Sequence, residues 1–130
     1  MSQKTAIATE NAPSAIGPYS QAIKQNGWLY VSGQIALDPK SGTLIGAGDV
    51  GKETHQVMQN LAAILEAAGG SFKDVVKCNI FLADMNDFGT VNEIYASYLA
   101  EPFPARATVQ VAVLPKQVQV EIDATAFIGE

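Results

Sequence analysis

Charge, cysteine and long apolar runs are all scarce in this sequence. Only 16% of its 130 residues are charged, against about a quarter in an ordinary globular protein. The single cysteine, Cys78, excludes an intramolecular disulfide, and with it the disulfide frameworks of small secreted domains. No apolar run approaches the ~20 residues of a membrane-spanning helix, and the first residues carry no signal-peptide core. We therefore expect a protein of the reducing cytoplasm with no membrane partner.

Positive charge and metal-ligating residues are scarce as well. The chain has 13 Asp and Glu against 8 Lys and Arg, for a net charge of −5, and Arg106 is its only arginine. Surfaces that bind nucleic acid are usually basic, so this balance disfavours an RNA or DNA ligand. One histidine, His55, and one cysteine cannot build the usual four-ligand zinc site, and we expect no metal.

Hydrophobic residues are plentiful, at 48% of a chain long enough for a single domain, 1–130, with a buried core. Glycine and proline divide the chain into short segments whose hydrophobic periodicity distinguishes strands from helices. We predict strands over 5–9, 20–25, 28–35, 75–84, 106–113 and 119–128, and helices over 49–68 and 87–100. Two helices are enough to cover one face of one sheet. The predicted fold class is therefore α+β, a two-layer sandwich of a mixed sheet with both helices on one face.

The last two predicted strands alternate in polarity and carry the most information. We expect them to pair as a hairpin through a loop at 114–117, which sets Val109 opposite Ile122. One face of that hairpin then gathers polar side chains, namely Arg106, Thr108, Gln110, Glu121, Asp123 and Thr125. Phe81 and Phe127 add apolar surface to the same side of the sheet. Such a face is too apolar for water and too polar for a core, so we expect another subunit to cover it.

Arg106 is the strongest single candidate for a functional residue. It follows Phe103-Pro104-Ala105 at the start of a strand, and its planar guanidinium matches a carboxylate or phosphate through two parallel hydrogen bonds. The alternative is a structural ion pair with Glu121 or Asp123 across the hairpin. Spacing alone leaves these two interpretations open.

Several stretches of the chain resemble one known family, the reactive intermediate deaminase A family (RidA or YjgF), some of whose members are called L-PSP endoribonucleases. The resemblance covers nearly the whole chain. Its matching residues are Ala12-Pro13, 15–22 (AIGPYSQA), 31–35 (VSGQI), Val76-Lys77, 81–88 (FLADMNDF), 91–95 (VNEIY), 104–106 (PAR), Val109, Ala112, Leu114 and 120–122 (VEI).

The resemblance implies a chorismate-mutase-like fold assembled as a homotrimer, with a ligand cleft at each subunit interface. It also implies a reaction, the hydrolysis of reactive 2-enamine or 2-imine acids, such as 2-aminoacrylate and 2-iminobutyrate, to 2-keto acids and ammonia. No cofactor is implied, because the imine is already an activated electrophile.

The resemblance assigns roles to individual residues of this sequence. Arg106 would hold the substrate carboxylate, and Glu121 would be the acid or base that handles the attacking water. Further substrate-binding positions would be Tyr19, Ser32, Gly33, Asn92 and Thr108. One position departs from the family pattern, since many bacterial members carry a cysteine where this chain has Thr108. Mechanisms that use that thiol do not carry over.

Two other functions stand beside the deaminase. An endoribonuclease that cuts single-stranded RNA and blocks translation is disfavoured by the acidic balance and the lone arginine. A non-catalytic trimer that binds a carboxylate metabolite without turnover is the other alternative. Imine hydrolysis by the purified protein separates the first function from both of these.

Overall fold

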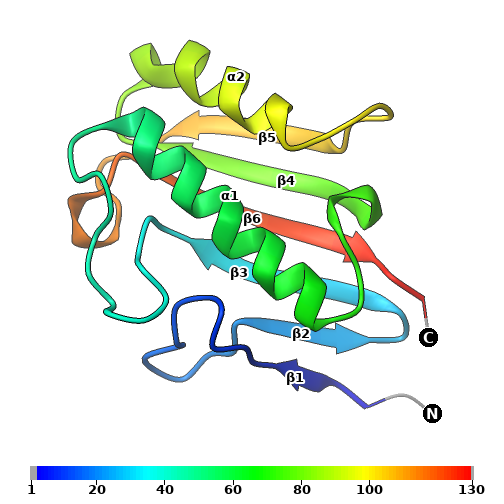
Figure 1. Ribbon diagram of the computed structural model, residues 1–130. Helices are drawn as coiled ribbons and strands as arrows, with labels where there is room; N and C mark the ends of the chain where they lie inside the picture. The colour runs from blue at the N-terminus through cyan, green and yellow to red at the C-terminus, as the bar shows by residue number, and fades with distance from the viewer. Residues whose placement is uncertain (1–2, 130) are drawn as a thin grey trace.

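A computed structural model, which describes residues 3–129, has one six-stranded sheet covered on one face by two helices (Figure 1). The strand order is β1-β2-β3-β6-β4-β5. The elements are β1 (Thr5–Ile7), β2 (Ala22–Gln25), β3 (Trp28–Gln34), α1 (Val50–Ala67), β4 (Val75–Leu82), α2 (Phe88–Ser97), β5 (Ala105–Gln110) and β6 (Val120–Phe127). The predicted α+β two-layer sandwich is confirmed. No helix within residues 3–129 combines the length and the apolar character needed to cross a membrane.

Local sequence signals explain where α1 begins and ends. The Asp49 carboxylate accepts a hydrogen bond from the Lys52 amide and caps the first turn. After the last turn, Gly69 has φ +90°, a conformation that glycine adopts without strain. The buried side of α1 packs against β3 and β6 and includes Val57, Met58, Leu61, Ile64 and Leu65. The predicted helix over 49–68 is confirmed.

The hairpin between β2 and β3 also follows its sequence. Asn26 and Gly27 both have positive φ, 55° and 83°, as a two-residue type I′ turn requires. The second helix is shorter than the predicted 87–100, because a 3₁₀ turn at Met85–Asp87 precedes α2 and the helix ends at Ser97.

The predicted hairpin between the last two strands is wrong. β5 pairs in parallel with β4, and β6 lies between β3 and β4, antiparallel to both. The cause is α2, which carries the chain from β4 back to the start of a parallel neighbour, as β-α-β crossovers do. β6 takes the centre of the sheet because the four side chains on its helix-facing side are fully apolar and buried, namely Val120, Ile122, Ala124 and Ala126.

The corrected pairing divides the predicted polar face in two. Arg106 is the register partner of buried Cys78, so it lies on the helix-covered face of the sheet, and Thr108 and Gln110 lie on that face with it. Glu121 is the register partner of Phe81 and lies on the opposite, uncovered face with Asp123 and Thr125. Successive side chains of a strand point to opposite faces of the sheet. Because the partner of β5 was predicted wrongly, Arg106, Thr108 and Gln110 were all assigned to the wrong face.

The uncovered face mixes polar and apolar groups, as predicted. Trp28 and Phe127 meet there edge to face, with ring centroids 4.9 Å apart, and both are more than a third exposed. Tyr30 adds a ring that is 53% exposed. Exposed aromatic surface of this kind is typical of a face that another protein covers. Trimer formation itself remains a prediction.

Candidate functional site

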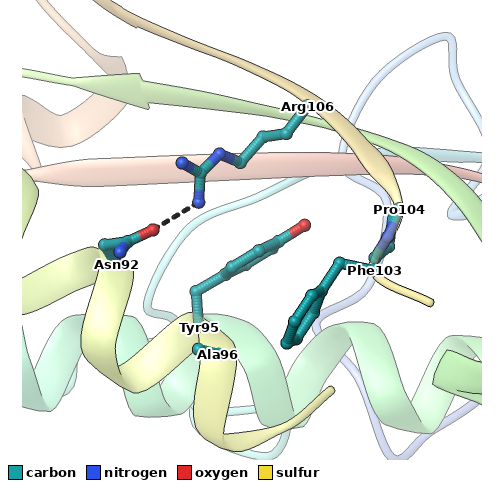
Figure 2. Close-up of a pocket in the computed structure, with 6 residues that line it drawn as sticks. All are labelled: Asn92, Tyr95, Ala96, Phe103, Pro104 and Arg106. Atoms are coloured by element: carbon teal, nitrogen blue, oxygen red, sulfur yellow. Dashed lines mark hydrogen bonds between the residues drawn. The ribbon is translucent and has the colours of Figure 1, made fainter. Parts of the chain in front are cut away.

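Helix α2 holds the Arg106 guanidinium through three side chains. One guanidinium nitrogen donates a hydrogen bond to the Asn92 side-chain oxygen (Figure 2). The guanidinium carbon also lies 5.4 Å from the centre of the Phe88 ring and 5.3 Å from that of Tyr95, within cation–π range. These three residues are spaced four and three apart, which places them on one side of the helix. Arg106 is therefore aimed by contacts that leave most of its donors free.

The Arg106 pocket is a cavity of about 400 Å³ between α2 and the start of β5. Its lining residues, all drawn in Figure 2, are Asn92, Tyr95, Ala96, Phe103, Pro104 and Arg106. Among residues 3–129, the polar partner of the guanidinium is an amide oxygen and not a carboxylate. The alternative of a structural ion pair with Glu121 or Asp123 is therefore wrong, and Asp123 instead accepts from the Asn79 amide at 3.0 Å. An arginine without a carboxylate partner is available to an anionic ligand.

Behind Arg106, the buried polar groups are neutral. Burial raises the pKa of the Tyr95 hydroxyl, and the adjacent Cys78 raises it further. Burial also raises the pKa of the Cys78 thiol, so this cysteine is a small buried hydrophobic residue and not a nucleophile. Both the Tyr95 and the Thr108 hydroxyl groups are buried, and within residues 3–129 that of Thr108 has no hydrogen-bond partner. Arg106 is thus the charged group of its pocket.

On the other face of the sheet, Glu121 lies against the backbone of β3 at Gly33. A β-carbon built on Gly33 would lie 2.0 Å from one carboxylate oxygen of Glu121, so a larger residue at position 33 would displace this carboxyl group. Gly33 falls where the pairing of β3 with β6 shifts register, between Val31 and Gln34. Burial, and second the like charge of Asp123, raise the pKa of Glu121 above its usual range. A raised pKa suits a carboxyl group that exchanges protons near neutral pH.

The Glu121 pocket is a second cavity, of about 520 Å³. Four predicted site residues line it: Tyr19, Ser32, Gly33 and Glu121. The rest of the lining is Pro13, Ser14, Ile16, Gln21, Gln34, Ile35, Leu37, Pro115 and Lys116. Tyr19 is 54% exposed, whereas the Ser32 hydroxyl already donates to the Ser20 carbonyl at 2.6 Å. This wall therefore offers a tyrosine, a half-buried carboxyl group and apolar surface to a ligand.

The predicted site residues therefore form two groups within one chain. Arg106, Asn92 and Thr108 belong to the helix-covered side. The four predicted residues that line the Glu121 pocket form the other group, with Glu121 on the uncovered side. Two interstrand spacings, about 10 Å, separate the strands of Arg106 and Glu121, and their side chains leave opposite faces. Sequence reasoning missed Phe88 and Tyr95, although their helical spacing from Asn92 was the available signal.

The sequence profile of the family described as Endoribonuclease L-PSP matches residues 9–128. Nearly the whole described chain is covered. The chain belongs to this family, which is the RidA/YjgF family that its motifs resemble. Among curated RidA/YjgF relatives, human 2-iminobutanoate/2-iminopropanoate deaminase is 53% identical over 123 residues, covering 95% of this chain and 89% of the human protein.

Solved structures of the RidA/YjgF family share the fold throughout. RidA from the Antarctic bacterium Psychrobacter superposes with a TM-score of 0.91 at 47% identity, covering 95% of this chain and 99% of its own. The YjgF gene product of E. coli gives a TM-score of 0.89 at 46% identity, covering 95% and 98%. The fold described above is thus that of the RidA/YjgF family.

Proposed function

We propose that this chain is an enamine/imine deaminase, which hydrolyses 2-imino acids such as 2-iminobutanoate and 2-iminopropanoate to 2-keto acids and ammonia. The observation that carries the proposal is the Arg106 guanidinium, held by Asn92 and two aromatic rings and free of any carboxylate partner within residues 3–129. A substrate of this class always presents a carboxylate. Relatives that carry the deaminase name at about 53% identity support the same reaction.

We further propose that the reaction site lies between two subunits of a homotrimer. Arg106 and Glu121 leave opposite faces of one sheet, so a single chain does not direct both at one small substrate. Cyclic symmetry resolves this difficulty, because the Arg106 pocket of one subunit then faces the Glu121 pocket of the next. The exposed rings on the uncovered face supply apolar surface for such an assembly.

In the proposed mechanism, Arg106 holds the substrate carboxylate by two parallel hydrogen bonds, which fixes the imine carbon. A water molecule adds its oxygen to that carbon, and Glu121 accepts the proton that the water loses. The same carboxyl group passes that proton to the imine nitrogen, which gives a tetrahedral carbinolamine, and then moves the hydroxyl proton of this intermediate to the amine nitrogen. The carbon–nitrogen bond then breaks, leaving a 2-keto acid and ammonia, with one water consumed. This mechanism gives Thr108 no role in proton transfer.

A coupled assay tests the proposed function. A pyridoxal-phosphate dehydratase acting on serine or threonine generates 2-aminoacrylate or 2-iminobutanoate, and loss of the imine is followed with and without this protein. We expect faster imine loss, with 2-keto acid formed in equal amount. No acceleration, together with tight binding of 2-oxobutanoate, would instead establish a non-catalytic metabolite-binding protein.

The endoribonuclease alternative is supported by the description of the matching family. Against it stand the net charge of −5 and a single arginine, which leave few cations to neutralise phosphates. RNA cleavage that persists through purification and is lost in an Arg106→Ala variant would establish this activity. We expect no such cleavage.

A further inference from the structure

Gln21 is a buried polar residue whose side-chain hydrogen bonds, among the residues that the structure describes, all go to the backbone of one loop. It lies directly before β2 and is 5% exposed. Its side-chain oxygen accepts from the Thr9 amide at 2.7 Å. Its side-chain nitrogen donates to the carbonyls of Thr9, Ala12 and Pro13 at 3.0, 3.3 and 2.8 Å. One amide group therefore fastens the beginning of the loop at several points.

The loop that Gln21 fastens forms one wall of the Glu121 pocket. Residues 8–20 contain no helix or strand, yet Pro13, Ile16 and Tyr19 from this segment line the pocket. Among the described residues, the other hydrogen bonds of the loop lie within it or at its end: the Tyr19 amide donates to the Gly17 carbonyl at 2.8 Å, and the Ser32 hydroxyl donates to the Ser20 carbonyl at 2.6 Å. Holding an irregular segment in one conformation costs about 1–2 kcal/mol of backbone entropy per residue, so its shape depends on such ties.

We propose that Gln21 is a positioning residue for the reaction: it fixes the loop of residues 9–19 so that Tyr19 and Ile16 form a ready-made wall beside Glu121. This inference rests on the proposed function, because the wall is useful only if the pocket receives substrate. A preformed wall lowers the entropic cost of binding, so its loss acts mainly on KM. Glu121 lies on the central strand and keeps its place, so kcat changes little.

Two variants remove the fastening in different ways. Gln21→Glu keeps the length and the acceptor but cannot donate to the three carbonyls, and it adds a buried charge. Gln21→Met keeps the volume without any hydrogen bond or charge. Thr54→Val is the matched control, because Thr54 is fully buried on α1 and its hydroxyl donates to the Val50 carbonyl at 2.7 Å, away from the loop. All three changes remove a buried hydrogen bond, but only two release the loop.

Hydrogen–deuterium exchange and imine-hydrolysis kinetics on the assembled protein test the proposal together. We expect faster amide exchange over residues 9–19 and a KM raised about tenfold in both Gln21 variants, with kcat within about twofold of wild type. Thr54→Val should leave both readouts unchanged even if its melting temperature falls.

Unchanged exchange in the loop, or a KM no higher than that of Thr54→Val, would overturn the proposal. Failure of both Gln21 variants to fold and assemble would also overturn it, because Gln21 would then be a residue of the fold alone. Absence of imine hydrolysis in the wild-type protein is a separate result, which removes the proposed function itself.

Discussion

The Arg106 pocket is built by one helix and the strand that follows it, whereas the Glu121 pocket is built by segments drawn from across the chain. In the first, Phe88, Asn92 and Tyr95 reach the guanidinium from successive turns of α2. In the second, the lining comes from residues 13–21, 32–37, 115–116 and 121. The contacts that hold Arg106 thus follow from the periodicity of one helix. The position of Glu121 depends instead on packing between segments that lie far apart in the sequence.

Two further buried polar side chains, both on α1, follow the same division. Asn60 on α1 donates to the carbonyls of Ile35 and Leu37 at 3.2 and 3.1 Å. Glu53, also on α1, accepts from the Gln119 amide at 2.8 Å, just before β6. The two Asn60 bonds hold backbone that lines the Glu121 pocket, as Gln21 does, and the Glu53 bond holds the segment that leads into β6. Buried hydrogen bonds therefore hold the segments around the Glu121 pocket in place, as the turns of α2 do for the Arg106 pocket.

Removing the proton-handling group should have the largest effect. Glu121→Gln keeps the shape of the side chain but cannot accept a proton from water, so we expect kcat to fall by about two decades or more. Steady-state kinetics of imine hydrolysis measure this loss. Glu66→Gln, the same change at an exposed position on α1, should leave kcat unaltered. A Glu121→Gln protein with more than half of wild-type kcat would remove Glu121 from the mechanism.

Removing the anion-holding group should come next. Arg106→Ala should lower kcat/KM by about one to two decades, because a charged hydrogen-bonded contact is worth roughly 1.5–3 kcal/mol. Arg106→Lys keeps the charge without the planar fork and should fall between. Melting temperature should change little, since Arg106 has no ion pair to lose within residues 3–129. A folded and fully active Arg106→Ala protein would contradict the proposal that Arg106 holds the substrate carboxylate.

A smaller change tests how Glu121 is seated. Gly33→Ala would place a β-carbon 2.0 Å from the Glu121 carboxylate and displace it, so we expect kcat to fall about tenfold. Gly89→Ala is the control, because a β-carbon there meets nothing within 4 Å. Equal kcat for the two variants would mean that the position of the carboxylate against β3 does not matter.

The smallest expected effect is a shift in pH dependence. Asp123 raises the pKa of Glu121, so Asp123→Asn removes a like charge and should lower that pKa. Glu121 acts as a base in its ionised form, so the acid limb of kcat against pH should move to lower pH. A shift to higher pH, or none, would show that Asp123 does not act on Glu121.

Most of the fold was accessible from the sequence because its signals are local. The Asp49 cap, the Asn26-Gly27 turn and the alternation along 119–128 each specify one element without reference to the others. Strand order is a long-range property, and the predicted hairpin failed there. The β-α-β order of residues 75–110 was the available sign of parallel pairing.

The candidate site shows the same limit. The family motifs identified Arg106, Glu121 and Tyr19 as site residues. Because the neighbour of β5 was predicted wrongly, alternation along the strands could not show that Arg106 and Glu121 occupy opposite faces of the sheet. Gln21 and Asn60 read from sequence as ordinary polar residues, since nothing local shows that their amides reach distant carbonyls.

The division of the site between two subunits is tested most directly by mixing two inactive variants. Arg106→Ala and Glu121→Gln chains are co-assembled in equal amounts, and imine hydrolysis is compared with that of each variant alone. If each site takes Arg106 from one subunit and Glu121 from the next, about one quarter of the sites in random trimers combine two intact groups. We therefore predict recovery of about one quarter of wild-type kcat/KM. No recovery above the separate variants would contradict the account, because both groups would then have to come from the same chain.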